Sequence, residues 1–93
     1  MQAGVTIRAL GHISFLLGGS ERRLVCEGQT QVSSILAQLK SAYPLFSEYL
    51  GQLENSNDKL LILRPDGQEL NLNSQVDPGE ELILVTPISG GVL

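Results

Sequence analysis

The fold is decided by a segment in the middle of the chain, residues 30–44, which reads TQVSSILAQLKSAYP. Its apolar residues recur at the i, i+3, i+4 and i+7 spacing of an amphipathic helix: Val32, Ile35, Leu36 and Leu39. Thr30 is a suitable N-cap, and Pro44 ends the helix because it biases Tyr43 away from helical angles. We therefore expect a helix of roughly three turns from about Gln31 to Ala42.

Segments with strand patterns lie on both sides of this helix. Val5–Ala9 alternates apolar and polar residues, as a half-buried strand does. The full set of expected strands is Val5–Ala9, Arg23–Glu27, Lys59–Arg64, Gln68–Leu72 and Glu81–Thr86. The unbroken apolar centre of Lys59–Arg64 favours a central strand or one buried on both faces. Leu45–Leu50 is expected to form a short helical turn, and Pro65-Asp66-Gly67 a tight turn.

This order of elements predicts an α+β domain in which one main helix covers one face of a single mixed sheet. The expected core draws residues from the helix stripe and the strands: Val5, Ile7, Leu24, Cys26, Val32, Ile35, Leu36, Leu39, Leu61, Leu63, Leu82 and Leu84. The strand residues in this set depend on parity, because a slip of one residue exchanges the two faces of a strand.

Composition and charge exclude several classes of function. The 93 residues are enough for one domain with a modest core. The net charge of −4, with no basic stripe, argues against nucleic-acid binding and favours a basic patch on a protein partner. The sequence has no apolar run of about 20 residues, the length that spans a membrane, and no signal peptide. We expect a cytoplasmic protein.

The residues that usually carry catalysis or bind metals are scarce. Cys26 is the only cysteine and His12 the only histidine, so the common ligand clusters and nucleophile–histidine sets are hard to build. Cys26 is expected to pack as a small hydrophobe, and His12 to lie in a solvated loop. The chain by itself is not expected to be an enzyme, and we expect no bound cofactor or metal.

The chain ends in a segment of a different kind, Ile88-Ser89-Gly90-Gly91-Val92-Leu93. Two consecutive glycines have little intrinsic structure. We expect residues 1–87 to form the folded domain and residues 88–93 a flexible tail that becomes ordered only inside a partner. A thin tail of this kind, Ser89, Gly90 and Gly91 in particular, can enter a narrow channel where a Cβ would clash.

Taken together, these features resemble the ubiquitin-like β-grasp proteins, and among them the sulfur carriers of the MoaD/ThiS group. The resemblance spans nearly the whole chain. It rests on four features: strand Val5–Ala9, the helix from Thr30 to the Tyr43-Pro44 stop, the turn Asp77–Leu82, and the ending Thr86–Gly91. In that family the second glycine is usually the last residue, whereas here Val92 and Leu93 follow it.

The resemblance implies a function for the tail. A partner that uses ATP and Mg adenylates the terminal glycine carboxylate, and sulfur then attacks to give a thiocarboxylate, as in molybdopterin or thiamin biosynthesis. By this analogy Gly91 is the activated residue and Val92-Leu93 a removable extension. The implied partners are an adenylating, ubiquitin-activating-like enzyme, a processing peptidase, and a sulfurtransferase or synthase subunit.

Two alternatives share the fold but differ in function. The chain is either a sulfur carrier, or a ubiquitin-like modifier that is activated in the same way and joined to target lysines. In a third interpretation it is a β-grasp interaction module whose Gly90-Gly91 pair is only a frayed end. The sequence also leaves open the final acceptor, the oligomeric state and the roles of Cys26 and His12.

Overall fold

Helix α2 (Val32–Ala42) forms where the apolar periodicity predicts it. Its buried residues are Val32, Ile35 and Leu39. Tyr43 has an extended backbone, with φ −128°, as expected of the residue before a proline. The expected Thr30 N-cap is wrong. The N-cap is Gln31, which makes no capping hydrogen bond through its side chain, because Thr30 and Gln31 pair in a short strand.

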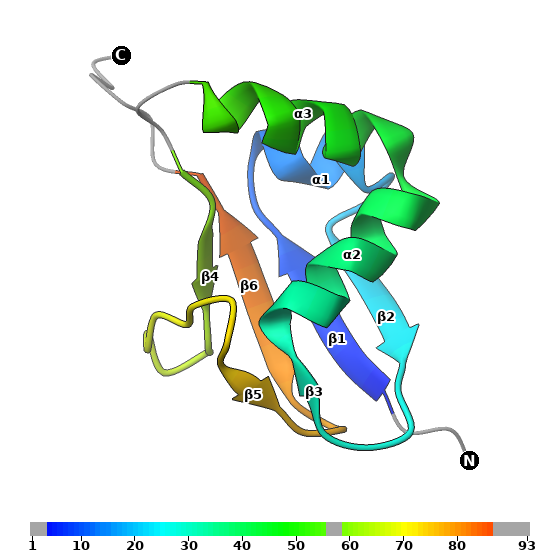
Figure 1. Ribbon diagram of the computed structural model, residues 1–93, viewed down its shortest axis with the longest axis vertical. Coiled ribbons are helices and arrows are strands. Elements are labelled where there is room, and N and C mark those ends of the chain that lie inside the picture. Colours follow the sequence, from blue (N-terminus) through cyan, green and yellow to red (C-terminus); the bar gives the residue numbers. More distant parts are fainter. Residues whose placement is uncertain (1–3, 56–58, 87–93) are drawn as a thin grey trace.

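The computed structural model describes residues 4–55 and 59–86 (Figure 1). The elements in chain order are β1 (Gly4–Ala9), α1 (His12–Leu16), β2 (Glu21–Val25), β3 (Thr30–Gln31), α2 (Val32–Ala42), α3 (Pro44–Glu54), β4 (Leu61–Leu63), β5 (Gln75–Val76) and β6 (Glu81–Val85).

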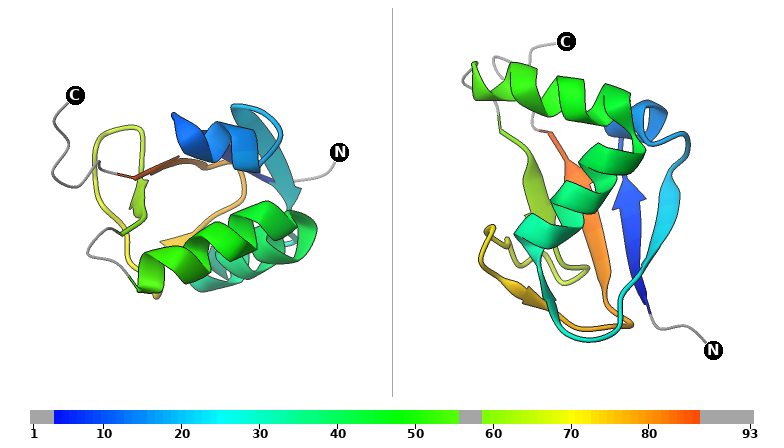
Figure 2. Two further views of the ribbon diagram at one scale, coloured as in Figure 1. Left: turned by 90° about the horizontal axis from the view of Figure 1, so that it is seen from above. Right: turned by 45° about the vertical axis from the view of Figure 1, so that its right-hand side comes forward.

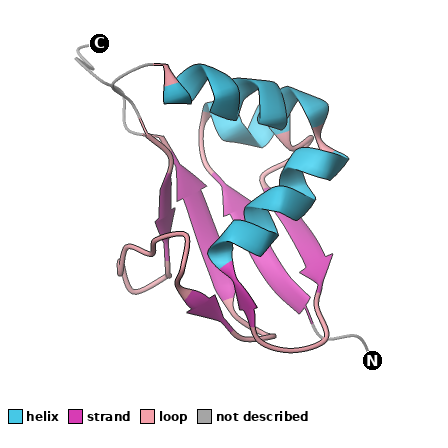
Figure 3. Ribbon diagram, in the orientation of Figure 1, coloured by secondary structure: helices cyan, strands magenta, loops and turns pink. Residues whose placement is uncertain are grey.

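The main sheet has four strands in the order β2-β1-β6-β4, and it is mixed (Figure 3). β6 runs parallel to β1 and antiparallel to β4, while β1 and β2 form an antiparallel pair. The first and last strands of the described residues therefore lie side by side at the centre of the sheet. The expected position of the Lys59–Arg64 strand is wrong, because β4 is an edge strand.

Helices α2 and α3 lie on the same side of the main sheet (Figure 2). The core fills the space between them and the sheet, and α1 contributes Ile13. The buried residues are Val5, Ile7, Ala9, Ile13, Leu17, Val32, Ile35, Leu39, Phe46, Ile62, Leu70, Val76, Leu82 and Leu84. Three expected core residues, Leu24, Cys26 and Leu36, are only partly buried against this cluster.

The expected burial of Leu61 and Leu63 is wrong, because the opposite face of β4 is the buried one. Ile62 is the buried residue of β4, at 5% exposure, and its two neighbours lie on the opposite face of the sheet. Successive side chains of a strand point to opposite faces. An all-apolar strand therefore gives no indication of which face is buried.

Two segments are more helical than the sequence predicts. The short turn expected at Leu45–Leu50 is part of α3, which has 11 residues, begins with Pro44 at its first turn and buries Phe46. Pro44 therefore ends α2 and also begins α3, since proline suits the first position of a helix. The expected loop around His12 is the short helix α1.

The return strand expected at Gln68–Leu72 is replaced by two smaller features. Glu69 makes an isolated bridge to Leu63, and the chain then forms a two-stranded sheet in which Thr30 pairs with Val76 and Gln31 with Gln75. The expected Pro65-Asp66-Gly67 turn is confirmed. Gly67 has φ 93°, a conformation that favours glycine, and its N–H donates to the Arg64 carbonyl at 2.9 Å.

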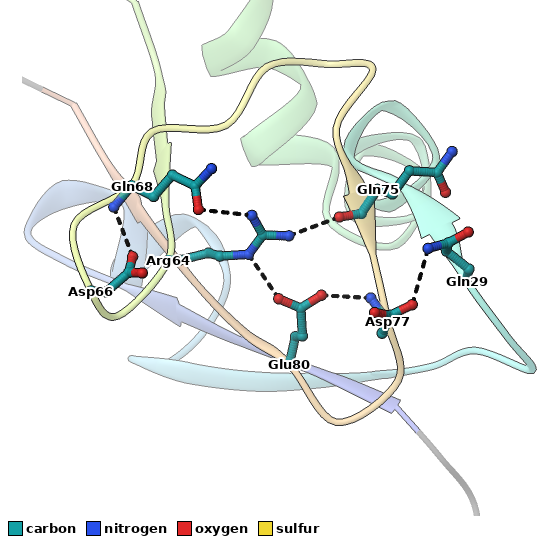
Figure 4. A network of polar contacts seen from close by, with 7 residues as sticks. All are labelled: Gln29, Arg64, Asp66, Gln68, Gln75, Asp77 and Glu80. Atoms are coloured by element: carbon teal, nitrogen blue, oxygen red, sulfur yellow. Dashed lines mark hydrogen bonds and ion pairs between the residues drawn. The ribbon is translucent and has the colours of Figure 1, made fainter.

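A polar network centred on Arg64 joins β4, β5 and the turn that precedes β6 (Figure 4). The Arg64 guanidinium donates from Nε to Glu80 Oε1 at 2.8 Å, from Nη1 to Gln68 Oε1 at 3.1 Å and from Nη2 to the Gln75 carbonyl at 2.9 Å. Glu80 Oε2 accepts the Asp77 backbone N–H at 2.7 Å. The hydrogen bond from Arg64, followed by that from Asp77, lowers the pKa of Glu80, and the same bond raises the pKa of Arg64.

The helices in the described part of the chain are too short and too polar for any of them to cross a membrane.

Replacing Ile35 tests the packing of α2. Ile35 is 2% exposed, and Ile35→Ala is expected to lower the free energy of unfolding by roughly 2–5 kcal/mol, because it removes buried methyl groups and leaves a cavity. Urea unfolding followed by circular dichroism measures the change. Gln38→Ala on the exposed side of the same helix is the control, with an expected change within about 0.5 kcal/mol. Equal stability of the two variants would contradict this packing.

The Arg64 network predicts a pH dependence of stability. Because the pKa of Glu80 is lowered in the folded protein, its charge stabilises the fold above the ordinary glutamate pKa, and this contribution is lost as the pH falls through the lowered value. Glu80→Gln is therefore expected to be less stable than the native chain at pH 7, with the difference shrinking on acidification. Urea titrations from pH 7 downward measure it.

Glu27→Gln is the matched control, because it removes the same charge outside the Arg64 network. If the difference in free energy of unfolding between the native chain and Glu80→Gln stays constant with pH, Glu80 contributes through packing and not through its charge.

Candidate functional site

The candidate site is the carboxyl end of β6, from which the Gly-Gly segment continues. β6 is held on both sides: Leu84 is in register with Ala9 of β1 and Ile62 of β4, and Val85 with Leu61. Leu82 and Leu84 point into the core and are fully buried. The described chain then ends at Thr86, one residue beyond the strand. The starting point of the tail is therefore fixed by the core of the domain.

The parallel pairing of β1 and β6 brings the carboxyl ends of both strands to one end of the molecule (Figure 1). Leu10, the first residue after β1, donates its N–H to the Leu84 carbonyl at 3.1 Å. Helix α1 begins at His12, so it lies at the end of the sheet from which the tail leaves. The His12 ring contacts Tyr49 of α3 edge-on, with ring centroids 5.3 Å apart.

All the site residues predicted from the tail lie outside the described residues: Ser89, Gly90, Gly91, Val92 and Leu93. Pro87 and Ile88, at the expected boundary between domain and tail, do so as well. The expectation of a flexible tail therefore stays a prediction. What the structure adds is the position from which this segment starts and the surfaces that surround that position.

One such surface is an apolar patch on the face of the sheet opposite α2 and α3. It consists of Leu61 and Leu63 of β4 and Ile83 and Val85 of β6, and we refer to it as the outer patch. The register places Leu61 beside Val85 and Leu63 beside Ile83, and all four side chains are partly exposed. The outer patch therefore reaches the last residue of β6.

Sequence reasoning missed the outer patch, although a signal was present. A sheet with one solvated face normally alternates apolar and polar residues. The runs Leu60–Leu63 and Leu82–Val85 are instead apolar at both parities. When helices cover only one face of a sheet, every second side chain of such a strand lies on the uncovered face. Apolar residues at these positions therefore form an exposed apolar patch.

Arg8 and two carboxylates border the outer patch on the β1 side. Arg8 is in register with Ile83, and its Nε lies 2.6 Å from Glu81 Oε2, while its Nη2 lies 3.5 Å from Glu21 Oε1. Pairs as exposed as these contribute little to stability. Their position beside apolar side chains gives the patch a polar rim on this side, as protein interfaces have.

A second apolar surface lies on the helical side of the sheet, between α2, α3 and β4. This hollow has a volume of about 540 Å³, and we refer to it as the helix groove. Its lining residues are Ser33, Leu36, Ala37, Lys40, Leu50, Leu53, Glu54, Lys59, Leu60, Ile62 and Leu72. Lys40 and Lys59 are the only lysines of the sequence. Lys59 Nζ lies 3.5 Å from Glu69 Oε2.

Cys26 and His12 do not come together. Val25 pairs with Gly4 at the start of β1, so Cys26 lies near that end, whereas His12 follows the other end of β1. Cys26 packs against the core but is only partly buried, not fully buried as expected. His12 is exposed, although on a helix and not in a loop. Among the described residues no three His, Cys, Asp or Glu side chains form a group that could hold a metal ion.

Comparison with known proteins identifies the fold. No protein-family model matches the chain, and no curated protein matches its sequence. The fold is similar to a crystal structure of SAMP1 from Haloferax volcanii, with TM-score 0.77 and 25% identity, covering 95% of this chain and 99% of that chain. A crystal structure of H. volcanii small archaeal modifier protein 1 matches with TM-score 0.76 and 23% identity, covering 92% and 99%. The expected ubiquitin-like β-grasp fold is confirmed.

Proposed function

We propose that this β-grasp chain is a small carrier protein that an ATP-dependent enzyme activates at the carboxylate of Gly91. One observation carries the proposal: a Gly-Gly pair begins five residues beyond Val85, the last residue of a strand fixed at the centre of the sheet. The similarity to a small archaeal modifier protein over almost the whole of both chains supports it. In this proposal the carrier supplies the reacting carboxylate, and the partner holds ATP and Mg and performs catalysis.

The activation step conserves atoms and charge without an oxidant or reductant. A carboxylate oxygen of Gly91 attacks the α-phosphorus of ATP, an O–P bond forms, and pyrophosphate leaves. The product is an acyl-adenylate whose carbonyl accepts a second nucleophile, with AMP as the leaving group. This chemistry requires a free carboxylate on Gly91, and so in this proposal a peptidase first removes Val92-Leu93.

Two physical arguments favour Gly91 over Leu93 as the activated residue. Val92 is β-branched and stiff at χ1, whereas two glycines carry no side chain that a narrow channel must accommodate. Moreover, two extra residues displace the carboxylate by up to about 7 Å in an extended chain. A misplacement of about 1 Å can already cost about a hundredfold in rate.

The outer patch is the surface on which we place the adenylating partner. It combines four apolar side chains at the end of β6 with the polar rim formed by Arg8 and its carboxylate partners. A partner seated there holds the domain close to the point where the tail begins. Orientation of this kind contributes to catalysis because it places the reacting carboxylate before the chemical step.

The acyl-adenylate has two candidate fates. In the first, a sulfide equivalent from a sulfurtransferase attacks the carbonyl to give a thiocarboxylate, which donates sulfur to a synthase subunit of the molybdopterin or thiamin type. In the second, the amine of a target lysine attacks, directly or after transfer to a protein thiol, and an isopeptide forms. The second fate is favoured by one observation, that the similar solved structures are of a modifier protein.

Activation is tested with a chain that ends at Gly91. On a cognate adenylating enzyme this chain is expected to support exchange of pyrophosphate into ATP, while the 93-residue chain is expected not to, because its carboxylate is displaced. Gly91→Val in the shortened chain is expected to fold normally and to fail in the exchange. Equal exchange by the long and short chains would overturn the role of Gly91.

Intact-mass analysis of the products distinguishes the two fates. After addition of a sulfurtransferase, the carrier is expected to exchange one oxygen for one sulfur. Covalent adducts with target proteins, formed in a lysate and resistant to thiols, would instead assign the modifier function. If no adenylating enzyme acts on either chain, the interpretation as an interaction module replaces both.

Docking through the outer patch is tested by Leu63→Gln in the chain that ends at Gly91. The KM for the carrier is expected to rise about five- to thirtyfold with little change in kcat, since residues central to an interface contribute about 1–2 kcal/mol. Val25→Gln is the matched control, because Val25 is 52% exposed on the distant edge strand β2. A normal KM for Leu63→Gln, with stability checked by urea unfolding, would place the partner elsewhere.

A further inference from the structure

The helix groove is an apolar surface that the function proposed above does not use. Leu36 of α2, Leu50 of α3 and Leu60 beside β4 line it, and all three are only partly buried. Leu72, one of the most exposed large apolar side chains at 55%, lies on its border. Its volume of about 540 Å³ is in the range of pockets that bind small ligands, roughly 300–1,000 Å³.

We propose that the helix groove binds Val92 and Leu93 of the same chain. Before removal of these residues, the segment after β6 then folds back across β4 and places this apolar pair between α2 and α3. The binding does not depend on the proposed function. Its consequence rests on that function: the docked chain keeps Gly91 on the surface of its own domain and away from an adenylating partner.

The geometry of the sheet brings the start of this segment close to the groove. Val85 is in register with Leu61, whose neighbour Leu60 lines the groove, and adjacent strands lie about 4.8 Å apart. Seven residue steps separate Val85 from Val92 and span up to about 23 Å. Helices and sheets pack roughly 10 Å apart, so the chain has enough length to cross β4 and reach the groove.

The chemistry of the segment also suits the groove. Residues 87–93 carry no charged side chain, so the one charge that accompanies Leu93 is its terminal carboxylate. A lysine suits a carboxylate, and Lys40 and Lys59 line the groove. The charged lining residues are Lys40, Glu54 and Lys59, while most of the others are apolar. A tether of only a few residues gives an effective concentration on the order of millimolar, so even a weak affinity populates the docked state.

Amide chemical shifts of isotopically labelled protein test this proposal without any partner enzyme. The 93-residue chain is compared with the chain that ends at Gly91. Amides of groove residues, Leu36, Ala37, Leu50 and Leu60, are expected to differ between the two chains, while amides of β2 are expected to coincide. The double variant Val92→Ser/Leu93→Ser keeps the chain length and is expected to give groove shifts like those of the shortened chain.

A charge placed in the groove supplies the reciprocal test. Ala37 is an exposed lining residue of α2, and Ala37→Glu is expected to abolish the groove differences between the long and short chains. Gln38→Glu adds the same charge at the next position, outside the lining, and is expected to preserve them. Both substitutions are at exposed helix positions, so unfolding does not obscure the result.

Three outcomes would overturn the proposal. If the amide chemical shifts of the groove residues coincide in the long and short chains, this segment does not occupy the groove. Differences that Ile88→Ser abolishes, and that survive Val92→Ser/Leu93→Ser, would assign a different anchor. Differences that grow with protein concentration would show that the tail enters a second copy. Each result is independent of the pyrophosphate-exchange experiment, so failure here leaves activation at Gly91 intact.

Discussion

The pairing of β6 with a strand on each side is the constraint on which the rest of the structure depends. β6 is the last element of the described chain, yet it lies between β1 and β4, with Leu82 and Leu84 fully buried. Fraying is the usual behaviour of a chain end, and here it is prevented up to Val85. The Arg64 network secures the opposite end of β6 by binding Glu80 just before the strand begins. A firm body with a tail starting at a defined point is the architecture that presentation of a carboxylate needs.

Sequence periodicity predicted the elements whose burial follows one simple pattern. The stop at Pro44 agrees with the structure, and the strand expected at Glu81–Thr86 is observed at Glu81–Val85. Three of the four stripe residues of α2 are buried, all but Leu36. The length of α3 could also have been predicted, because Phe46, Tyr49, Leu50 and Leu53 recur at helical spacing, although Gly51 interrupts the pattern. The parity of β4 could not have been predicted. A strand that is apolar on both faces fits either side of the sheet equally well, and only the global packing decides between them.

The candidate site was predictable to a different degree in each of its parts. The Gly-Gly tail is a local motif, so its candidate residues could be named from the sequence, and they lie outside the described residues. The outer patch and the helix groove are products of tertiary structure. They join β4 to β6 and α2 to α3, and their members become neighbours only once the strand order is known. The two lysines are 19 positions apart in the sequence, and both line the groove.

The central position of β6 also has a mechanical consequence. A force applied beyond Thr86 acts along the strand, and the hydrogen bonds of both ladders run across it. Such a load shears the two ladders together, whereas a pull on an edge strand perpendicular to its axis opens the bonds one after another. The domain should therefore resist traction by its carboxyl end. A protease or unfoldase that works by pulling should find this end a harder place to start than β2, which has a neighbour on only one side in the described sheet.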